Sequence, residues 1–220
     1  MGRIEVIDPR GALRVTERPL AARGHALAGR RIGFLSNKKA NATLLLSEIE
    51  TLLRERLGAF EVVRGEKGAA VPAPPELMVE LESCAAVVTA MADCGSCTSW
   101  SLHDAVTLEE KGVPSVLLCT DEFAPLARAE SVAKGMGGLP LAVIPHPLAD
   151  NAPHEVRSKA QAIAAEVLTI LTRPAAELEQ RYRPLYHRLA ETRLGRQAAC
   201  IDEVCVVDPA GVASGAEPAA

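Results

Sequence analysis

Short unbroken runs of apolar residues alternate with amphipathic stretches through the middle of the chain. The apolar runs are typical of buried strands, whereas apolar positions spaced three and four apart are typical of helices. The predicted strands are residues 31–36, 60–63, 85–90, 115–120 and 141–144. The predicted helices are residues 42–57, 74–81, 98–111, 124–134, 154–171 and 175–194, the last interrupted near Pro184. This alternation predicts an α/β fold, doubly wound around a mostly parallel, flavodoxin-like sheet.

The same pattern divides the chain into four parts. An irregular N-terminal arm, residues 1–30, is rich in proline, glycine and arginine. The α/β core spans 31–174, and a C-terminal helix with an edge segment spans 175–209. Residues 210–220 are small and polar and have nothing to bury, so we predict a disordered tail.

Composition favours an ordinary globular protein, with 48% apolar and 24% charged residues. The formal net charge of −4 and an aromatic content of 3% argue against a surface that binds nucleic acid. No apolar run approaches the roughly 18 residues of a membrane span, and the opening sequence MGRIEVIDPRG has no apolar segment of signal-peptide length. We therefore expect a cytoplasmic protein with neither a membrane nor a nucleic-acid partner.

Six cysteines are too few for a disulfide scaffold in a chain of this length. Only Cys94 and Cys97 form a C-x-x-C pair, and no second pair or spaced histidines accompany them, so the sequence predicts no metal site. Cys119 lies in a predicted core strand, although it could be a second reactive thiol if that strand neighbours the strand before Cys94. Cys200 and Cys205 flank the edge segment CIDEVC, and we assign them no chemistry.

Polar residues follow several of the predicted strands at their carboxyl ends. Ligands of doubly wound sheets bind beyond these ends, because the loops there converge on one edge. A purely structural edge would need only turn-forming residues. The residues expected to contact a substrate at this edge are Asn37, Lys38, Asn41, Asp93, Gly95, Ser96, Thr98, Thr120 and Glu122.

The segment Cys94-Gly95-Ser96-Cys97 joins a predicted strand to a predicted helix. Gly95 allows a tight bend that presents Cys94 at the helix N-terminus, where the macrodipole and free N–H groups stabilise a thiolate. Cys97 falls one turn further and could resolve a sulfur adduct by forming a disulfide. The alternative is that both cysteines are small core residues at a strand–helix junction. We favour Cys94 as nucleophile and Cys97 as its partner.

Histidines and carboxylates offer candidates for proton transfer. His146 lies between two prolines directly after a predicted strand and is the favoured base, although it could be only a turn residue. His103 and Asp104, on the helix after Cys97, are supporting candidates that could equally be a structural helix pair. Asn41 could instead be an N-cap and the neighbouring lysines a solvated face. No glycine-rich phosphate loop is present, so we predict no nucleotide cofactor.

The stretch ADCGSCTSWSLHDAVTLEEKGVPSVLLCTDEF, followed by IPHPL, resembles the UGSC-type selenoprotein family, and FLSNKKANATLLLSEIETLL resembles its N-terminal asparagine-lysine segment. Members carry selenocysteine or cysteine at the first motif position. The resemblance implies that Cys94 occupies that position and Cys97 is the partner thiol. It extends distantly to selenoprotein subunits of glycine- and betaine-type reductases, which cleave a carbon–nitrogen bond reductively. Ala40 stands where the segment leads us to expect proline.

These observations favour a thiol-dependent redox enzyme that acts on a small polar or anionic substrate, with reductive bond cleavage as one form of that reaction. An external dithiol, such as a thioredoxin-like protein, would restore the Cys94–Cys97 pair. One alternative is a redox-neutral enzyme resembling a racemase or lyase, with Cys94 and Cys119 opposed. Another is a thiol redox sensor or partner subunit without catalytic activity. The arginine-rich last helix could then contact a partner or a second copy of the chain.

Overall fold

Five parallel strands form the centre of the protein in a computed structural model that describes residues 15–185. The strands are β1 (Arg31–Ser36), β2 (Glu61–Glu66), β3 (Ala86–Ala92), β4 (Ser115–Thr120) and β5 (Leu141–Ile144). They pair in the order β2-β1-β3-β4-β5, and every pair is parallel. This is the doubly wound, flavodoxin-like arrangement predicted from the apolar runs, and the order reverses between β1 and β3.

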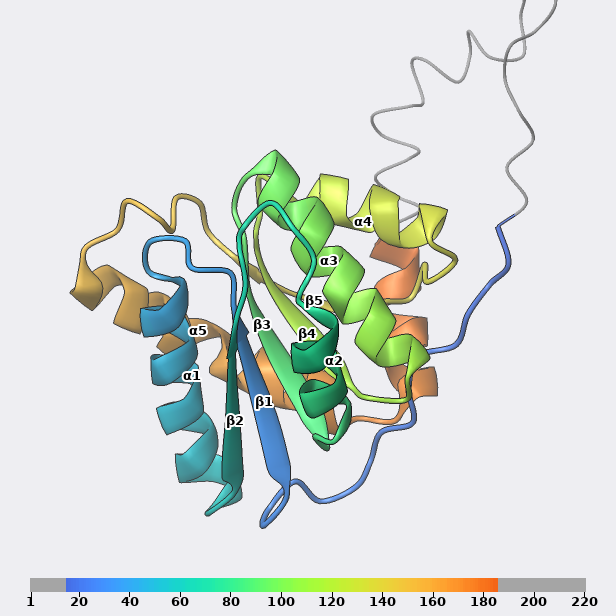
Figure 1. Cartoon of the computed structure of the whole chain (residues 1–220), viewed down its shortest axis with the longest axis horizontal. Helices are drawn as coiled ribbons and strands as arrows, with labels where there is room; N and C mark the ends of the chain where they lie inside the picture. Colours follow the sequence, from blue (N-terminus) through green and yellow to red (C-terminus); the bar gives the residue numbers. More distant parts are fainter. Residues whose placement is uncertain (1–14, 186–220) are drawn as a thin grey trace, which may run out of the picture.

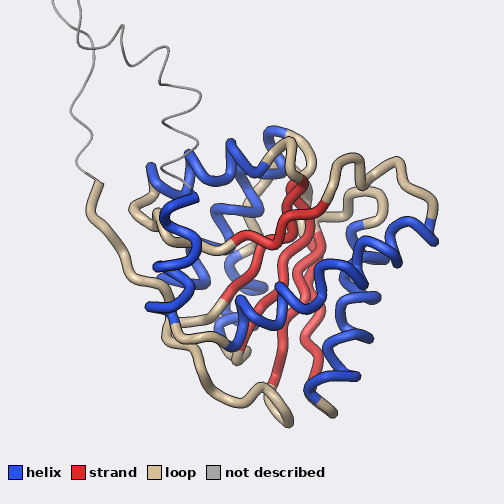
Figure 2. Tube along the Cα trace, turned by 180° about the vertical axis from the view of Figure 1, so that it is seen from behind, coloured by secondary structure: helices blue, strands red, loops and turns tan. Residues whose placement is uncertain are grey.

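Helices cover both faces of the sheet (Figures 1 and 2). The helices are α1 (Ala42–Leu57), α2 (Pro75–Glu82), α3 (Gly95–Glu110), α4 (Ala124–Ala133) and α5 (Pro153–Thr172). The first and last of these, α1 and α5, pack together on one face, and α2, α3 and α4 cover the other (Figure 1). Residues 175–185 are also helical, and that helix continues through Pro184 to the end of the described range.

The central strands are buried on both faces, which explains why their sequences read as unbroken apolar runs. All seven residues of β3 and all six of β4 are buried. The predicted bounds of β1, α1, β4 and β5 agree with the structure. Helix α3 begins at Gly95 rather than at Thr98, because the segment Gly95-Ser96-Cys97 forms the first helical turn instead of a connecting loop.

The described part of the N-terminal arm, residues 15–30, contains no helix or strand and is nevertheless anchored. The Arg23 guanidinium and the Glu109 carboxylate near the end of α3 form an ion pair with both side chains fully buried. Arg23 also donates to the Ile170 carbonyl near the end of α5 at 3.0 Å. In residues 15–185 no helix has the length and apolar character needed to cross a bilayer. The CIDEVC segment and the predicted tail lie outside the described residues.

Candidate functional site

An irregularity at the end of β3 precedes the two cysteines of the CGSC segment. The register between β3 and β4 shifts between Ala90 and Ala92, which leaves Met91 as an extra residue in β3. A β-bulge of this kind bends a strand and redirects the residues after it. Asp93 and Cys94 follow at once, at the edge of the sheet where the predicted site lies.

Cys94 and Cys97 cap the same helix end in a reciprocal arrangement. Cys94 is the N-cap of α3 in an extended conformation, and its sulfur accepts the backbone N–H of Cys97. In return, the backbone N–H of Cys94 donates to the Cys97 sulfur at 3.0 Å. The geometry is that of a capping box in which two sulfur atoms replace the usual oxygen acceptors. The helix terminus therefore holds both sulfur atoms next to its unpaired N–H groups.

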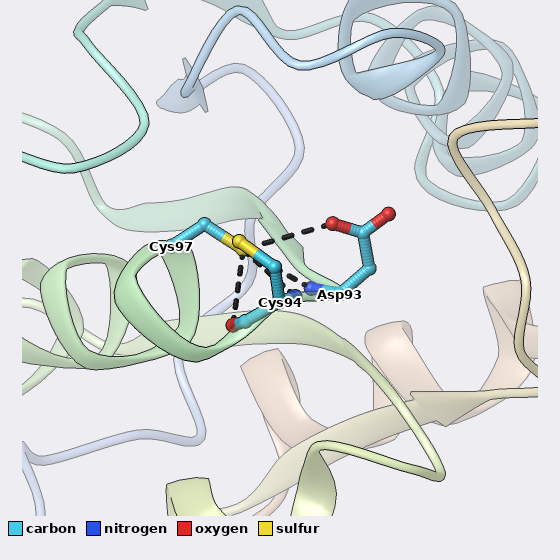
Figure 3. A group of neighbouring side chains, drawn as sticks. All are labelled: Asp93, Cys94 and Cys97. Carbon is cyan, nitrogen blue, oxygen red and sulfur yellow. Dashed lines mark hydrogen bonds between the residues drawn. The ribbon is translucent and has the colours of Figure 1, made fainter.

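The Cys97 sulfur lies inside the protein and contacts Asp93 as well as Cys94 (Figure 3). It accepts the backbone N–H of Asp93 at 3.4 Å. Its thiol lies 3.6 Å from Asp93 Oδ1 and 3.2 Å from the Cys94 carbonyl oxygen. Cys97 is fully buried, whereas Cys94 is half-buried and reaches the surface. The two thiols are adjacent but differ sharply in their access to solvent.

The same asymmetry appears in the acidity of the two thiols. Burial by itself would raise the pKa of Cys94, but hydrogen bonds from Cys97 and Ser96 and the Lys39 ammonium outweigh it and lower that pKa below the usual range. Burial, reinforced by the hydrogen bond with Cys94, raises the pKa of Cys97 to about 12. Ionisation of the pair as pH rises therefore begins at the half-buried Cys94, while the buried Cys97 keeps its proton.

Lys39 supplies the positive charge nearest to this pair. Its ammonium binds Asp93 Oδ1, and the Asp93 side chain is only 2% exposed. Burial disfavours the ammonium, but Asp93 and the two cysteines raise the pKa of Lys39 above its usual value. Lys38, the lysine predicted to contact a substrate, is exposed and lies against Glu66, with 3.2 Å between Nζ and Oε2.

Donor atoms of Asp93, Cys94 and Cys97 lie within 4.8 Å of one another in the described part of the chain. Such a group can bind a thiophilic cation if all its donors are free. Here the Lys39 ammonium occupies the carboxylate, and backbone N–H groups point at both sulfur atoms. Because the carboxylate is already paired with Lys39, we assign no metal to the group.

The two asparagines predicted to contact a substrate have structural roles instead. Asn37 is fully buried, and its side-chain amide donates to the Met91 carbonyl at 2.7 Å, which ties the end of β1 to the bulge in β3. The Asn41 amide donates to the carbonyls of Leu148 and Asn151, both at 2.9 Å, in the loop after β5. Asn41 is also the N-cap residue of α1, as the alternative expected, although its side chain makes no hydrogen bond to that helix. Both residues hold loops of the site in place.

His146 lies at the predicted edge of the sheet, but its ring contacts Thr120 rather than a thiol. Its Nδ1 is 3.2 Å from Thr120 Oγ1, and its backbone N–H donates to Asp121 Oδ1 at 2.9 Å. Thr120 Oγ1 lies 3.4 Å from the Ala92 carbonyl, two residues before Cys94. Thr120 is buried, so it supports His146 rather than a substrate, and Glu122 is exposed in the following turn.

A profile of the UGSC family matches residues 5–173, more than half of the chain. The protein belongs to the UGSC family. Among curated proteins, none matches this chain. Similar solved structures include the flavodoxin-like domain of a Synechococcus sp. protein, with 12% identity and a TM-score of 0.34 over 63% of this chain and 98% of that one. Diflavin flavoprotein A3 from Nostoc sp. has 15% identity and a TM-score of 0.36 over 65% of this chain and 96% of that one.

Within this UGSC protein, the first turn of α3 divides the remaining motif residues by exposure. Gly95 and Ser96 are exposed beside the Cys94 sulfur, and Ser96 hydrogen-bonds that sulfur. Thr98 is fully buried, and its hydroxyl donates to the Cys94 carbonyl at 2.5 Å. Ser96 is thus placed where it can meet a substrate, whereas Thr98 positions the backbone of the nucleophile.

The two supporting candidates on α3, Asp104 and His103, also differ in their surroundings. Asp104 is buried and forms an ion pair with Lys67, with 2.6 Å between Oδ2 and Nζ, and its Oδ1 accepts the Ala73 N–H at 3.0 Å. It therefore anchors the loop between β2 and α2. His103 packs edge-on against Trp100, with 5.7 Å between ring centroids. We therefore assign neither His103 nor Asp104 to the reaction.

Sequence reasoning missed Lys39 and Lys67, the two lysines closest to the thiols of this UGSC protein. Both follow strand ends, and that position is the signal in the sequence that could have identified them. Lys39 contacts Asp93, while the buried Lys67 ammonium interacts electrostatically with Cys97. Burial lowers the pKa of Lys67 despite its ion pair with Asp104.

Proposed function

We propose that this UGSC protein is a thiol-dependent redox enzyme in which Cys94 is the nucleophile and Cys97 the resolving thiol. One observation carries the proposal: adjacent sulfur atoms cap one helix end, and only the sulfur with the lowered pKa reaches the surface. A thiolate is the reactive form of cysteine, and the helix N-terminus stabilises it. The resemblance to proteins with selenocysteine at this position supports the same role for Cys94.

The proposed reaction oxidises two thiols to a disulfide and reduces the substrate by two electrons. The Cys94 thiolate attacks one atom X of a substrate bond X–Y, and Y departs with the bonding electrons and takes up a proton. Cys97 then attacks the Cys94 sulfur, so that X departs with a proton and a Cys94–Cys97 disulfide forms. The substrate gains two electrons and two protons, and the pair loses them. An external dithiol, in the manner of a thioredoxin-like protein, reduces the disulfide.

The substrate we propose is small and polar, with an anionic group that the N-terminus of α3 can accept. Lys39 is the cation closest to the thiolate, although Asp93 neutralises it in part. His146 is the group we propose for protonating the leaving atom Y, because it lies at the same sheet edge and reaches the surface. Thr120 orients its ring through Nδ1.

The redox-neutral alternative needs Cys119 to face a substrate from the opposite side. Cys119 is only 1% exposed, and burial raises its pKa to about 12. Its position in the core therefore favours the pair Cys94–Cys97 over the pair Cys94–Cys119. A redox sensor without catalytic activity would form the same Cys94–Cys97 disulfide but would consume no small molecule.

Intact-mass spectrometry on single cysteine variants tests the proposal. Cys200 and Cys205 are replaced by serine in every sample, and the reduced protein is exposed to panels of small electrophilic metabolites. Cys97→Ser should accumulate a covalent adduct on Cys94, whereas the parent should form the disulfide and lose two mass units per molecule. Cys94→Ser should show neither change. Equal adduct formation by Cys94→Ser, or none by any variant, would overturn the proposal.

A further inference from the structure

We propose that Asp93 is a catalytic base that removes the proton from Cys97 when the disulfide closes, and that Lys39 is the positioning residue that holds it. This inference rests on the proposed thiol chemistry. Sequence analysis placed Asp93 among the substrate contacts, but its side chain is 2% exposed and points to Cys97 rather than to solvent (Figure 3). Its Oδ1 lies 3.6 Å from the Cys97 sulfur, within the range of a thiol hydrogen bond.

The surroundings of the Cys97 sulfur leave Asp93 as its base. In the described part of the chain, the groups that contact this sulfur are two backbone N–H groups, the Cys94 carbonyl, the Cys94 sulfur and Asp93 Oδ1. The Cys94 sulfur carries X at this step, so it cannot take the proton. The N–H groups are donors and a carbonyl is not a proton acceptor of useful strength. Because Cys97 is fully buried, its sulfur has no direct contact with bulk solvent. A carboxylate is therefore the one group in contact that can take the proton.

Lys39 explains how a buried carboxylate stays available for this task. An isolated buried carboxylate is costly and tends to pick up a proton, whereas a paired one stays charged. The Lys39 ammonium binds Oδ1, the same oxygen that faces Cys97, and its side chain is 22% exposed. Lys39 thus fixes the position of the base from the solvent side.

The proposed step balances as follows. With X bound to the Cys94 sulfur, the S–H bond of Cys97 breaks and its proton passes to Asp93 as the new S–S bond forms. The Cys94–X bond breaks, and X leaves with its electron pair. Asp93 then returns the proton to X or to solvent, and the carboxylate is restored beside Lys39. No further oxidant or reductant takes part in this half of the cycle.

An aromatic disulfide, dithiobis-nitrobenzoate, separates the two steps because each releases one coloured thiolate. Attack by Cys94 releases the first, and closure by Cys97 releases the second. In Asp93→Asn the first phase should be at least as fast as in the parent, since Lys39 is left unpaired beside Cys94. The second phase should slow by about 100-fold or more, the usual contribution of a general base. A second phase of parental rate would overturn the assignment.

Controls keep this outcome apart from damage to the fold and from failure of the proposed function. All proteins carry serine at positions 200 and 205. Cys97→Ser should release the first thiolate only, and Asp150→Asn, which removes an exposed carboxylate from the loop after β5, should retain both phases. A parent protein without a first phase would contradict the proposed nucleophile itself. A normal first phase in Asp93→Asn reports an intact Cys94 site in the same molecules.

The pH profile of the second phase gives a readout that a structural role would not produce. Without Asp93, hydroxide must deprotonate Cys97, whose pKa is raised to about 12, so the rate should rise about tenfold per pH unit. The parent should show a weaker dependence. The charged and titratable groups that act on Cys97 or Asp93 are Lys39, Lys67, Cys94 and Cys119, and all remain in both proteins. Parallel profiles would contradict the role of Asp93.

Discussion

The ammonium of Lys39 binds the carboxylate of Asp93 across 54 positions of sequence, joining the loop after β1 to the end of β3. These loops meet because β1 and β3 are neighbouring parallel strands whose carboxyl ends share one edge. The contact places a positive charge beside Cys94 and fixes a negative charge beside Cys97. One ion pair therefore reaches both thiols: Lys39 helps to lower the pKa of Cys94, and Asp93 Oδ1 lies 3.6 Å from the Cys97 sulfur.

Removing the positive charge should make Cys94 less reactive. In Lys39→Met the pKa of Cys94 should rise, because the attraction that favours its thiolate is lost. We expect alkylation at neutral pH to slow about threefold to tenfold, since one pKa unit is a tenfold change in thiolate fraction near neutrality. Lys38→Met is the matched control, because Lys38 is exposed and pairs with Glu66. Equal slowing in both variants would show that net charge alone is responsible.

The pH dependence of alkylation should report the capping arrangement itself. Because the pKa of Cys94 is lowered, its alkylation should reach half its maximum below the pH at which a free cysteine does. Cys97→Ala removes one of the hydrogen bonds that lower this pKa, so its midpoint should move upward. Rates followed by peptide mass mapping assign the signal to Cys94. An unchanged midpoint would show that Cys97 does not stabilise the thiolate.

Buried thiols should weaken the fold at alkaline pH. The pKa of Cys119 is raised to about 12 by burial, so the unfolded chain releases this proton at lower pH than the folded one. Stability must then fall as pH rises above the usual cysteine range, by about 1.4 kcal/mol per pH unit and thiol. Cys97 acts in the same sense, whereas the lowered pKa of Cys94 adds stability that is lost as pH falls.

Urea unfolding of the reduced protein between about pH 9 and 11 measures this slope. Cys119→Ala should be less stable at neutral pH because of the cavity it leaves, but its stability should decline less steeply. The difference between the two slopes isolates the contribution of one thiol. Parallel curves would mean that Cys119 ionises as readily in the folded protein as in the unfolded one.

The buried ion pair beneath the site should dominate local stability. Asp104→Ala leaves the Lys67 ammonium without its partner in a fully buried position, which should cost about 3–5 kcal/mol. Glu177→Ala removes one member of the exposed pair with Arg173 and should change stability by less than about 1 kcal/mol. Denaturant unfolding compares the two. A small loss in Asp104→Ala would show that Lys67 reaches solvent without its partner.

Local sequence was sufficient to predict the layers of the fold. The apolar runs of β1, β4 and β5 and the periodic face of α1 have bounds that agree with the structure. Both faces of the central strands are buried, so their sequences are almost entirely apolar, with Thr89 in β3 as an exception, and the pattern changes where each strand ends. The same reasoning located Cys94 at the carboxyl edge of the sheet, because it follows such a run at once.

Side-chain direction beyond the strand ends depended on contacts between distant segments. Lys38 and Asn41 have positive φ angles of 59° and 67°. These angles turn the loop after β1 in a direction that the residue types alone do not predict. That turn sends Lys38 to Glu66 and brings Lys39 to Asp93. The sequence alone determined that a pair of thiols lies at the junction between a strand and a helix. Only the tertiary structure decided which charges reach it, because charges act through space and their positions depend on how separate loops pack.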